Sequence, residues 1–136
     1  MAVREIDRKE SKMEVLNVAR DMAAHILKMA SQETLVPRRH RWFLGTRLVD
    51  NAVSIYQLCV MANNTYVDSH EAAVRRINYY KFAYERSAGL LALLQVCELS
   101  VESLRGHRFF VIVEKVCDTQ AKIAMTIRNE KERFLK

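Results

Sequence analysis

Apolar residues recur along the chain with the period of an α-helix, and polar connections divide them into four segments. In the clearest segment the apolar stripe steps by four and three residues, and its members are Arg41, Gly45, Leu48, Ala52, Ile55, Cys59 and Ala62. Pro37 precedes this segment and Asn63-Asn64 follows it, so we predict a helix from Arg39 to Ala62. Gly45 inside this helix costs roughly 1 kcal/mol relative to alanine, which a close helix crossing would offset.

The first segment begins with a sequence signal for a helix start. Ser11 and Glu14 have the spacing of a capping box, in which the serine side chain accepts from the Glu14 amide and the glutamate reaches back. We therefore predict a helix from Ser11 to about Ser31, preceded by a frayed or partly helical leader over residues 1–10. The expected inward positions of this helix are Val15, Leu16, Ala19, Met22, Ala23, Ile26, Leu27 and Ala30.

The third segment predicts a long helix that is apolar on more than one side. Asp68 is its expected N-cap, with Ser69 as a rival, and Gly106 is the expected stop in a left-handed conformation. The first half carries one apolar row: Ala73, Ile77, Tyr80 and Tyr84. The later half carries two rows on different faces: Leu90, Leu93, Cys97, Val101 and Leu104, and Ala88, Leu91 and Leu94. Such a helix needs two partners, of which one is the core and the other can be a neighbouring subunit.

The fourth segment predicts a helix from His107 to Glu132. Its expected inward residues are Phe109, Phe110, Val113, Val116, Cys117, Ile123, Ala124 and Ile127. Four amphipathic helices with short connections indicate an all-α fold, an antiparallel up-down-up-down four-helix bundle, because short loops make successive helices antiparallel. With 136 residues, half of them hydrophobic, we expect one domain over residues 1–136.

Two basic clusters should meet at one end of such a bundle. The first is Arg38, Arg39, His40 and Arg41, and the second is Arg105, His107 and Arg108. The N-termini of the second and fourth helices point the same way, which favours an anion there. The net charge of +6 suits a polyanionic partner such as RNA or DNA. The alternative is that these arginines are merely solvated.

Cysteine usage and the N-terminal sequence bear on the compartment. Cys59, Cys97 and Cys117 are odd in number and lie among apolar residues, which favours buried thiols over disulfides or a metal site. Residues 1–12 are charged where a signal peptide needs an apolar core, and no apolar run approaches membrane-spanning length. We expect a cytoplasmic protein without a membrane partner.

Catalytic and metal-binding patterns are missing from the sequence. It contains no Glu-x-x-His pair, no glycine-rich phosphate loop, no nucleophile elbow and no Cys-x-x-Cys. Asp21 and His25 stand one helical turn apart, and we interpret them as a surface pair. We therefore expect no enzyme, no cofactor and no metal.

Aromatic and cationic residues alternate at the start of the third predicted helix. Tyr79, Tyr80 and Tyr84 lie beside Arg75, Arg76, Lys81 and Arg86. Such a pattern can hold single-stranded nucleic acid by stacking and phosphate contacts. We favour the simpler interpretation, in which Tyr80 and Tyr84 belong to the core and the cations lie in water.

One run of residues resembles a known family. Val36-Pro37-Arg38-Arg39-His40-Arg41-Trp42-Phe43-Leu44-Gly45-Thr46-Arg47-Leu48 resembles the signature that opens the second helix of four-helix-bundle proteins similar to the accessory variability determinant of diversity-generating retroelements. Related bundles occur as ribosomal-RNA intervening-sequence proteins of bacteria. The resemblance covers nearly the whole chain in helix number and order, but only this run is specific.

The resemblance implies a ring-like homopentamer with a basic central channel. It also implies binding of RNA and DNA with little sequence preference, and partnership with a reverse transcriptase during mutagenic copying of a template RNA. The matching basic positions are Arg38, Arg39, Arg41 and Arg47. Because Arg41 lies on the predicted buried stripe and Arg47 has Asp50 as a possible partner, these two fit either a structural or a binding role. Arg38 and Arg39 are the better candidates for binding phosphate. Arg105 and Arg108 are further candidates, because they should lie at the same end of the bundle.

Two functions from different classes follow. The first is an oligomeric nucleic-acid-binding accessory protein, and the second is a protein-interaction scaffold that uses the spare apolar face of the third helix.

Overall fold

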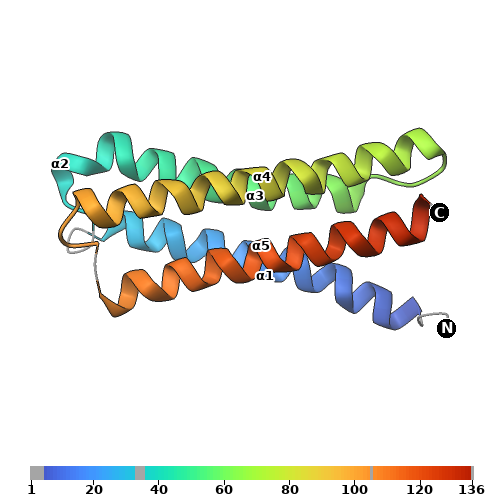
Figure 1. Cartoon of the computed structure of the whole chain (residues 1–136), viewed down its shortest axis with the longest axis horizontal. Coiled ribbons are helices and arrows are strands. Elements are labelled where there is room, and N and C mark those ends of the chain that lie inside the picture. Colours follow the sequence, from blue (N-terminus) through green and yellow to red (C-terminus); the bar gives the residue numbers. More distant parts are fainter. Residues whose placement is uncertain (1–4, 33–35, 105, 136) are drawn as a thin grey trace.

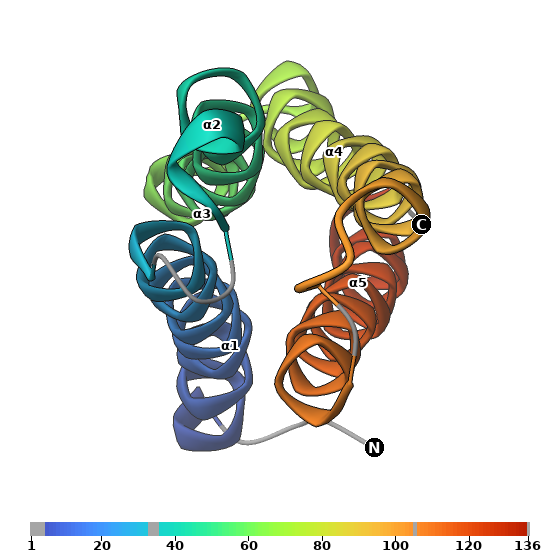
Figure 2. The ribbon, with the colours of Figure 1, turned by 90° about the vertical axis from the view of Figure 1, so that its left-hand side faces the viewer.

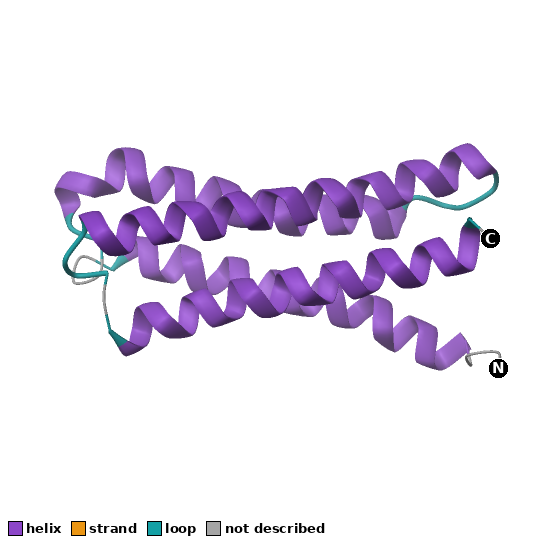
Figure 3. Ribbon diagram, viewed as in Figure 1, coloured by secondary structure: helices purple, strands orange, loops and turns teal. Residues whose placement is uncertain are grey.

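The computed structural model describes residues 5–32, 36–104 and 106–135, and within these ranges the regular structure is entirely helical (Figure 3). The elements are α1 (Glu5–Ser31), α2 (Arg38–His40), the π-helical turn η1 (Arg41–Gly45), α3 (Thr46–Asn64), α4 (His70–Ser100) and α5 (His107–Phe134). The predicted all-α class is confirmed.

Four long helices lie side by side along the long axis of the molecule (Figure 1). Among the described residues α1 contacts α3 and α5, and α4 also contacts α3 and α5, so α3 and α5 lie on a diagonal. Figure 2 looks onto the end that carries α2 together with the last turns of α1 and α4 and the first turn of α5. The start of α2 and the start of α5 therefore share one end of the molecule.

The core is built from the predicted helical stripes. Gly45 and the five α3 residues that follow it on the stripe, Leu48, Ala52, Ile55, Cys59 and Ala62, are all buried. The five α3 residues belong to one core cluster with Ile26 of α1, Leu90 of α4 and Ile123 of α5, each with no exposed surface. Two ion pairs join α1 to α5: Lys115 Nζ lies 2.8 Å from Asp21 Oδ2, and Lys122 Nζ lies 2.7 Å from Glu14 Oε1.

Two predicted helix starts are wrong. Helix α1 begins at Glu5, six residues before Ser11, so the capping-box spacing does not mark its start and most of the predicted leader is helical. Helix α4 begins at His70 after Ser69, whose side-chain oxygen accepts from the Ala72 amide at 3.1 Å. The rival cap Ser69, rather than Asp68, is therefore the N-cap.

The predicted stop at Gly106 is also wrong. Helix α4 ends at Ser100, and the chain then turns so that Val101 and Leu104 are buried outside the helix. Burial of these two apolar side chains stabilises the turn that ends the helix. Gly106 has a φ of 99° and a ψ of −165°, and it precedes α5 rather than capping α4. Its positive φ still explains the glycine.

The predicted helix from Arg39 to Ala62 is divided into α2, η1 and α3. The turn η1 is a π-helix over Arg41–Gly45, which adds a residue to one turn and changes the directions of the side chains that precede it. Within η1, Leu44 and Gly45 are buried, whereas Trp42 and Phe43 are exposed.

Some residues predicted to face inward lie on the surface. These are Leu27, Tyr84, Phe110 and Cys117. Each long helix has only two neighbouring helices among those described, so the edges of a wide apolar stripe remain uncovered. None of the described helices combines the length and apolarity that crossing a membrane requires.

Candidate nucleic-acid interface

Two predicted phosphate-binding residues lie on the three-residue helix α2. Pro37 opens the turn, and its carbonyl oxygen accepts from the His40 amide at 2.8 Å. The side chains of Arg38 and Arg39 are exposed. Arg39 Nε donates to His40 Nε2 at 3.2 Å. A short turn therefore presents two guanidinium groups to solvent.

The π-helical turn that follows presents aromatic rings beside these arginines. Trp42 is 86% exposed and Phe43 is 52% exposed. The ring of Phe43 meets the ring of His40 edge-on, with 6.1 Å between centroids. Exposed aromatic rings next to arginines are the combination that holds single-stranded nucleic acid. Sequence reasoning did not assign Trp42 to the site, although its place off the buried stripe of Arg41, Gly45 and Leu48 was a signal for exposure.

Arg47 extends this arrangement along α3. Its side chain is exposed one turn after Phe43, and its carbonyl oxygen accepts from Asn51 Nδ2 at 2.8 Å. Among the described residues the predicted pairing of Arg47 with Asp50 is not formed. The basic corner is the name we give to Arg38, Arg39, Trp42, Phe43 and Arg47.

The remaining predicted site residues are Arg108, Arg41 and Arg105. Arg108 lies on another helix, and the structure does not fully describe the other two. Arg108 is exposed in the first turn of α5, after the N-cap Gly106. It shares an end with the basic corner but lies across the bundle diagonal, because α5 and α3 are not neighbours (Figure 2). The backbone of Arg41 is in η1, but its side chain is outside the described set, as is the whole of Arg105. The shared end is therefore made of two separate corners.

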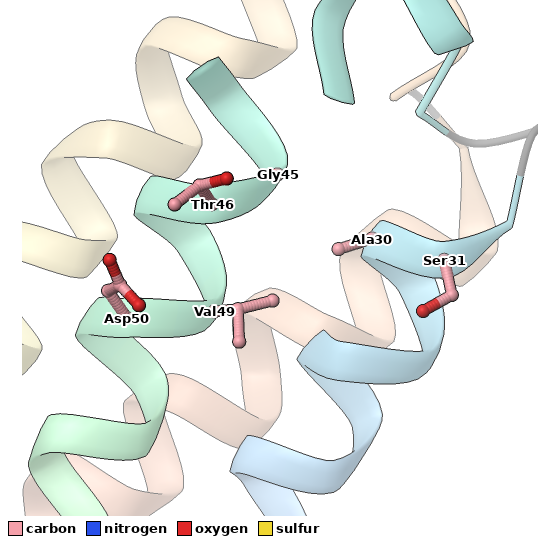
Figure 4. A pocket seen from close by; sticks show the side chains of 6 residues that line it. All are labelled: Ala30, Ser31, Gly45, Thr46, Val49 and Asp50. Atoms are coloured by element: carbon pink, nitrogen blue, oxygen red, sulfur yellow. The ribbon is translucent and has the colours of Figure 1, made fainter. Parts of the chain in front are cut away.

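A groove beside the basic corner offers hydrogen-bond acceptors and a carboxylate instead of cations. It has a volume of about 430 Å³ and is lined by Ala30, Ser31, Gly45, Thr46, Val49 and Asp50 (Figure 4). Ser31 Oγ donates to the Leu27 carbonyl at 2.8 Å, and Thr46 Oγ1 donates to the Trp42 carbonyl at 2.9 Å. Both hydroxyl protons are thus used within their own helices, and the groove offers acceptors and a carboxylate. Phosphate is therefore disfavoured in this groove.

Arg76, which the sequence analysis predicted to lie in water, is the most deeply buried cation among the described residues. Arg76 is 4% exposed, and its Nε and Nη2 donate to the two carboxylate oxygens of Glu130, each at 3.0 Å. Its Nη1 donates to the carbonyl oxygens of Ala62, Asn63 and Thr65 at 3.0, 3.2 and 3.2 Å. Arg76 therefore joins α4 to α5 and satisfies carbonyl groups at the C-terminal end of α3. The prediction that it is solvated is wrong.

Among the described residues, the other buried groups that could react are the Tyr80 hydroxyl and the thiols of Cys59 and Cys97. Tyr80 is buried as predicted, and the Arg76 guanidinium lies 6.0 Å from the centroid of its ring. Within the described part of the chain the Tyr80 hydroxyl lacks a hydrogen-bond partner, and burial raises its pKa. Burial also raises the pKa of the Cys59 thiol to about 12 and raises that of Cys97. Neither thiol is a nucleophile at neutral pH.

The Asp21 and His25 pair lies on the surface, as predicted. His25 Nδ1 is 3.4 Å from Asp21 Oδ1, and Lys115 of α5 joins the pair through its 2.8 Å contact to Oδ2. The hydrogen bond from Lys115 lowers the pKa of the Asp21 carboxyl despite a small opposing effect of burial. Across the described ranges, no three His, Cys, Asp or Glu residues are arranged to hold a metal ion.

No protein-family model, curated protein or solved structure matches this chain.

Proposed function

We propose that this chain is a non-catalytic accessory protein that binds RNA or DNA through the phosphate backbone. In this proposal it forms an antiparallel up-down-up-down four-helix bundle, assembles as a homopentamer and assists the reverse transcriptase of a diversity-generating retroelement in the cytoplasm. The observation that carries nucleic-acid binding is the basic corner, where the exposed Arg38 and Arg39 precede an indole ring that is 86% exposed.

Charge and accessibility support a binding role for these arginines. Among the described contacts, neither Arg38 nor Arg39 forms an ion pair with a carboxylate, and both side chains are exposed. The net charge of +6 attracts a polyanion over a distance of about a Debye length, roughly 8–10 Å at physiological salt. Phosphate contacts of this kind do not depend on base sequence.

The reverse-transcriptase partner and the pentamer rest on the family resemblance of residues 36–48. Assembly has independent support in exposed apolar side chains near the end of α4, where Val96 is 59% exposed and Leu99 is 81% exposed. These two side chains lie one turn apart and could form part of a surface that another protein covers.

The test of nucleic-acid binding is a fluorescence-anisotropy titration of a mixed-sequence single-stranded RNA and the equivalent DNA, between 50 and 200 mM salt. The logarithm of the affinity should fall linearly with the logarithm of salt concentration. The double variant Arg38→Glu, Arg39→Glu should bind both probes more weakly, at every sequence. Undetectable binding at 50 mM salt, or affinity that salt does not change, would contradict the proposal.

A charge-matched control separates the basic corner from the net charge. Arg128→Glu with Lys131→Glu removes the same charge from exposed positions in the second half of α5, whose C-terminal end lies away from α2 (Figure 1). This variant should retain most of the affinity. An equal loss in both double variants would mean that only the total charge matters.

A second candidate function is a protein-interaction scaffold, favoured by the exposed Val96 and Leu99 of α4. A scaffold of this kind would be a monomer that gains stability only with a protein partner. A closed homo-oligomer in light scattering, formed without any partner, would argue against it.

A further inference from the structure

A row of cationic and aromatic side chains runs along the outer face of α4. Arg75, Tyr79, Phe82 and Arg86 step by four, three and four residues, which places them on one side of the helix. Arg75 and Arg86 are exposed, Phe82 is 51% exposed, and Tyr79 packs partly against the core. The two cations are thus separated by two aromatic rings on one surface.

A groove between α3 and α4 lies beneath this row. It has a volume of about 430 Å³ and is lined by Leu58 of α3 with Phe82, Glu85 and Arg86 of α4. That volume falls in the range of roughly 300–1,000 Å³ that small-ligand sites occupy. The groove combines an aromatic ring and an aliphatic side chain with one guanidinium and one carboxylate.

The guanidinium groups on this face remain available to an external anion. The neighbouring Arg76 uses its donors on Glu130 and on carbonyl oxygens of the chain. By contrast, no ion pair of Arg75 or Arg86 occurs among the described residues. Charge complementarity therefore favours a partner that carries negative groups and flat rings.

We propose that this groove holds one nucleotide of a single-stranded nucleic acid, which is a second contact beyond the basic corner. The base stacks on Phe82 over Leu58, and Arg86 binds the adjacent phosphate. Glu85 accepts a hydrogen bond from an exocyclic amino group, which cytosine, adenine and guanine carry and uracil and thymine lack. This inference rests on the proposed nucleic-acid binding and adds to it a preference for amino-bearing bases.

The position of the groove suits a strand that also occupies the basic corner. Arg47 and Leu58 are 11 residues apart on α3, which is about three turns and about 16 Å along the axis, so they share a face of the helix. A strand can thus pass from the basic corner over Arg47 to the groove. Tyr79 and Arg75 extend the same row along α4.

The test uses labelled 12-nucleotide oligocytidine and oligouridine in anisotropy titrations with the full chain. Phe82→Ala should weaken binding of oligocytidine about 5- to 150-fold, the range expected when one base stack is lost. Phe82→Tyr keeps the aromatic face and should bind like the unmodified chain, whereas Phe82→Leu should behave like alanine. Because Phe82 is half-exposed, the free energy of unfolding of all three should stay close to that of the unmodified chain.

The role of the Glu85 carboxylate is tested by the ratio of the affinities for oligocytidine and oligouridine. The unmodified chain should prefer oligocytidine about 3- to 10-fold, the worth of one hydrogen bond. Glu85→Gln keeps an acceptor oxygen and should keep this ratio, while Glu85→Ala should bring it to one. The ratio is insensitive to the gain in affinity that loss of a negative charge brings to both probes.

The outcomes separate this inference from the proposed function. Binding that depends on Arg38 and Arg39 but not on Phe82 would overturn the inference and leave the proposed function intact. Phe82→Ala that changes the solution mass without changing oligonucleotide affinity would assign this face to protein contacts and would also overturn it. No binding by the unmodified chain at 50 mM salt would overturn both.

Discussion

Arg76 and Arg39 carry the same guanidinium group at opposite ends of the molecule, in opposite environments. Arg76 is 4% exposed and donates to Glu130 and to three carbonyl oxygens at the end of α3. Arg39 is exposed on α2, and the one side-chain contact described for it is with His40. Arginine content therefore indicates nothing about role until the partners of each group are known: the first stabilises the fold, and the second is available to a ligand.

The largest expected effect comes from removing the buried cation. Arg76→Ala leaves the Glu130 carboxylate buried without its partner and removes a hydrogen-bond donor from carbonyl groups at the end of α3. It should therefore lower the free energy of unfolding by about 3–5 kcal/mol. Urea denaturation followed by circular dichroism measures this change. The adjacent Arg75→Ala is the matched control, because Arg75 is exposed, and it should change stability by no more than about 0.5 kcal/mol. Equal small effects from both variants would remove the distinction between the two kinds of arginine.

The opposite result is expected at the basic corner. Arg38→Glu with Arg39→Glu should leave the free energy of unfolding within about 0.5 kcal/mol of the unmodified value. For single-strand binding, the slope of the logarithm of affinity against the logarithm of salt concentration should become shallower by about 1.4. Each of the two lost phosphate contacts contributes about 0.7 to this slope. A large loss of stability in this variant would mean that these arginines hold the fold as Arg76 does.

A single aromatic substitution sharpens the same comparison. Trp42→Ala should weaken single-strand binding by about 1–3 kcal/mol, the worth of a base stack, with little change in stability because the indole is 86% exposed. Trp42 is the only tryptophan, so quenching of its fluorescence on addition of RNA reports directly on this corner. Unchanged fluorescence at saturating RNA would place the nucleic acid elsewhere.

The smallest expected effect concerns the surface ion pair between Asp21 and Lys115. The pKa of Asp21 is lowered in the folded state, so its contribution to stability is present above the unfolded pKa near 4 and is lost as pH falls through the folded pKa. Because Asp21 is more than half exposed, Asp21→Asn should cost no more than about 1 kcal/mol at pH 7. The difference between the two proteins should vanish near pH 2. A difference that persists there would show that packing or polarity, rather than charge, explains the effect.

Local periodicity predicted much of the fold. The all-α class and the buried stripe from Gly45 to Ala62 follow from a pattern that repeats every three or four residues and needs no knowledge of distant contacts. Helix ends were harder, because several residues satisfy the same local rule: Asp68 and Ser69 are both good N-caps, and it is Ser69 whose side chain accepts from the Ala72 amide. Ser11 and Glu14 fit a capping box, yet α1 continues past them to Glu5.

Contacts between distant residues could not be predicted. Arg76 and Glu130 are 54 residues apart, and nothing near either one in the sequence indicates the other. At the candidate site, the exposure of Arg38, Arg39 and Arg108 agrees with the sequence prediction, and Arg47, for which the sequence left a structural or a binding role open, is exposed as well. Their separation into two corners depends on the diagonal placement of α3 and α5. Trp42 lies off the buried stripe of residues 41–62 and is exposed, but the π-turn that carries it is not revealed by the helical pattern.

The most direct test of nucleic-acid binding by an assembled accessory protein is the solution mass by light scattering, with and without a short single-stranded RNA, at 50 and 200 mM salt. The account predicts a closed oligomer whose mass increases by bound RNA at 50 mM salt, with less RNA bound at 200 mM. A monomer whose mass is the same with and without RNA at 50 mM salt would contradict it.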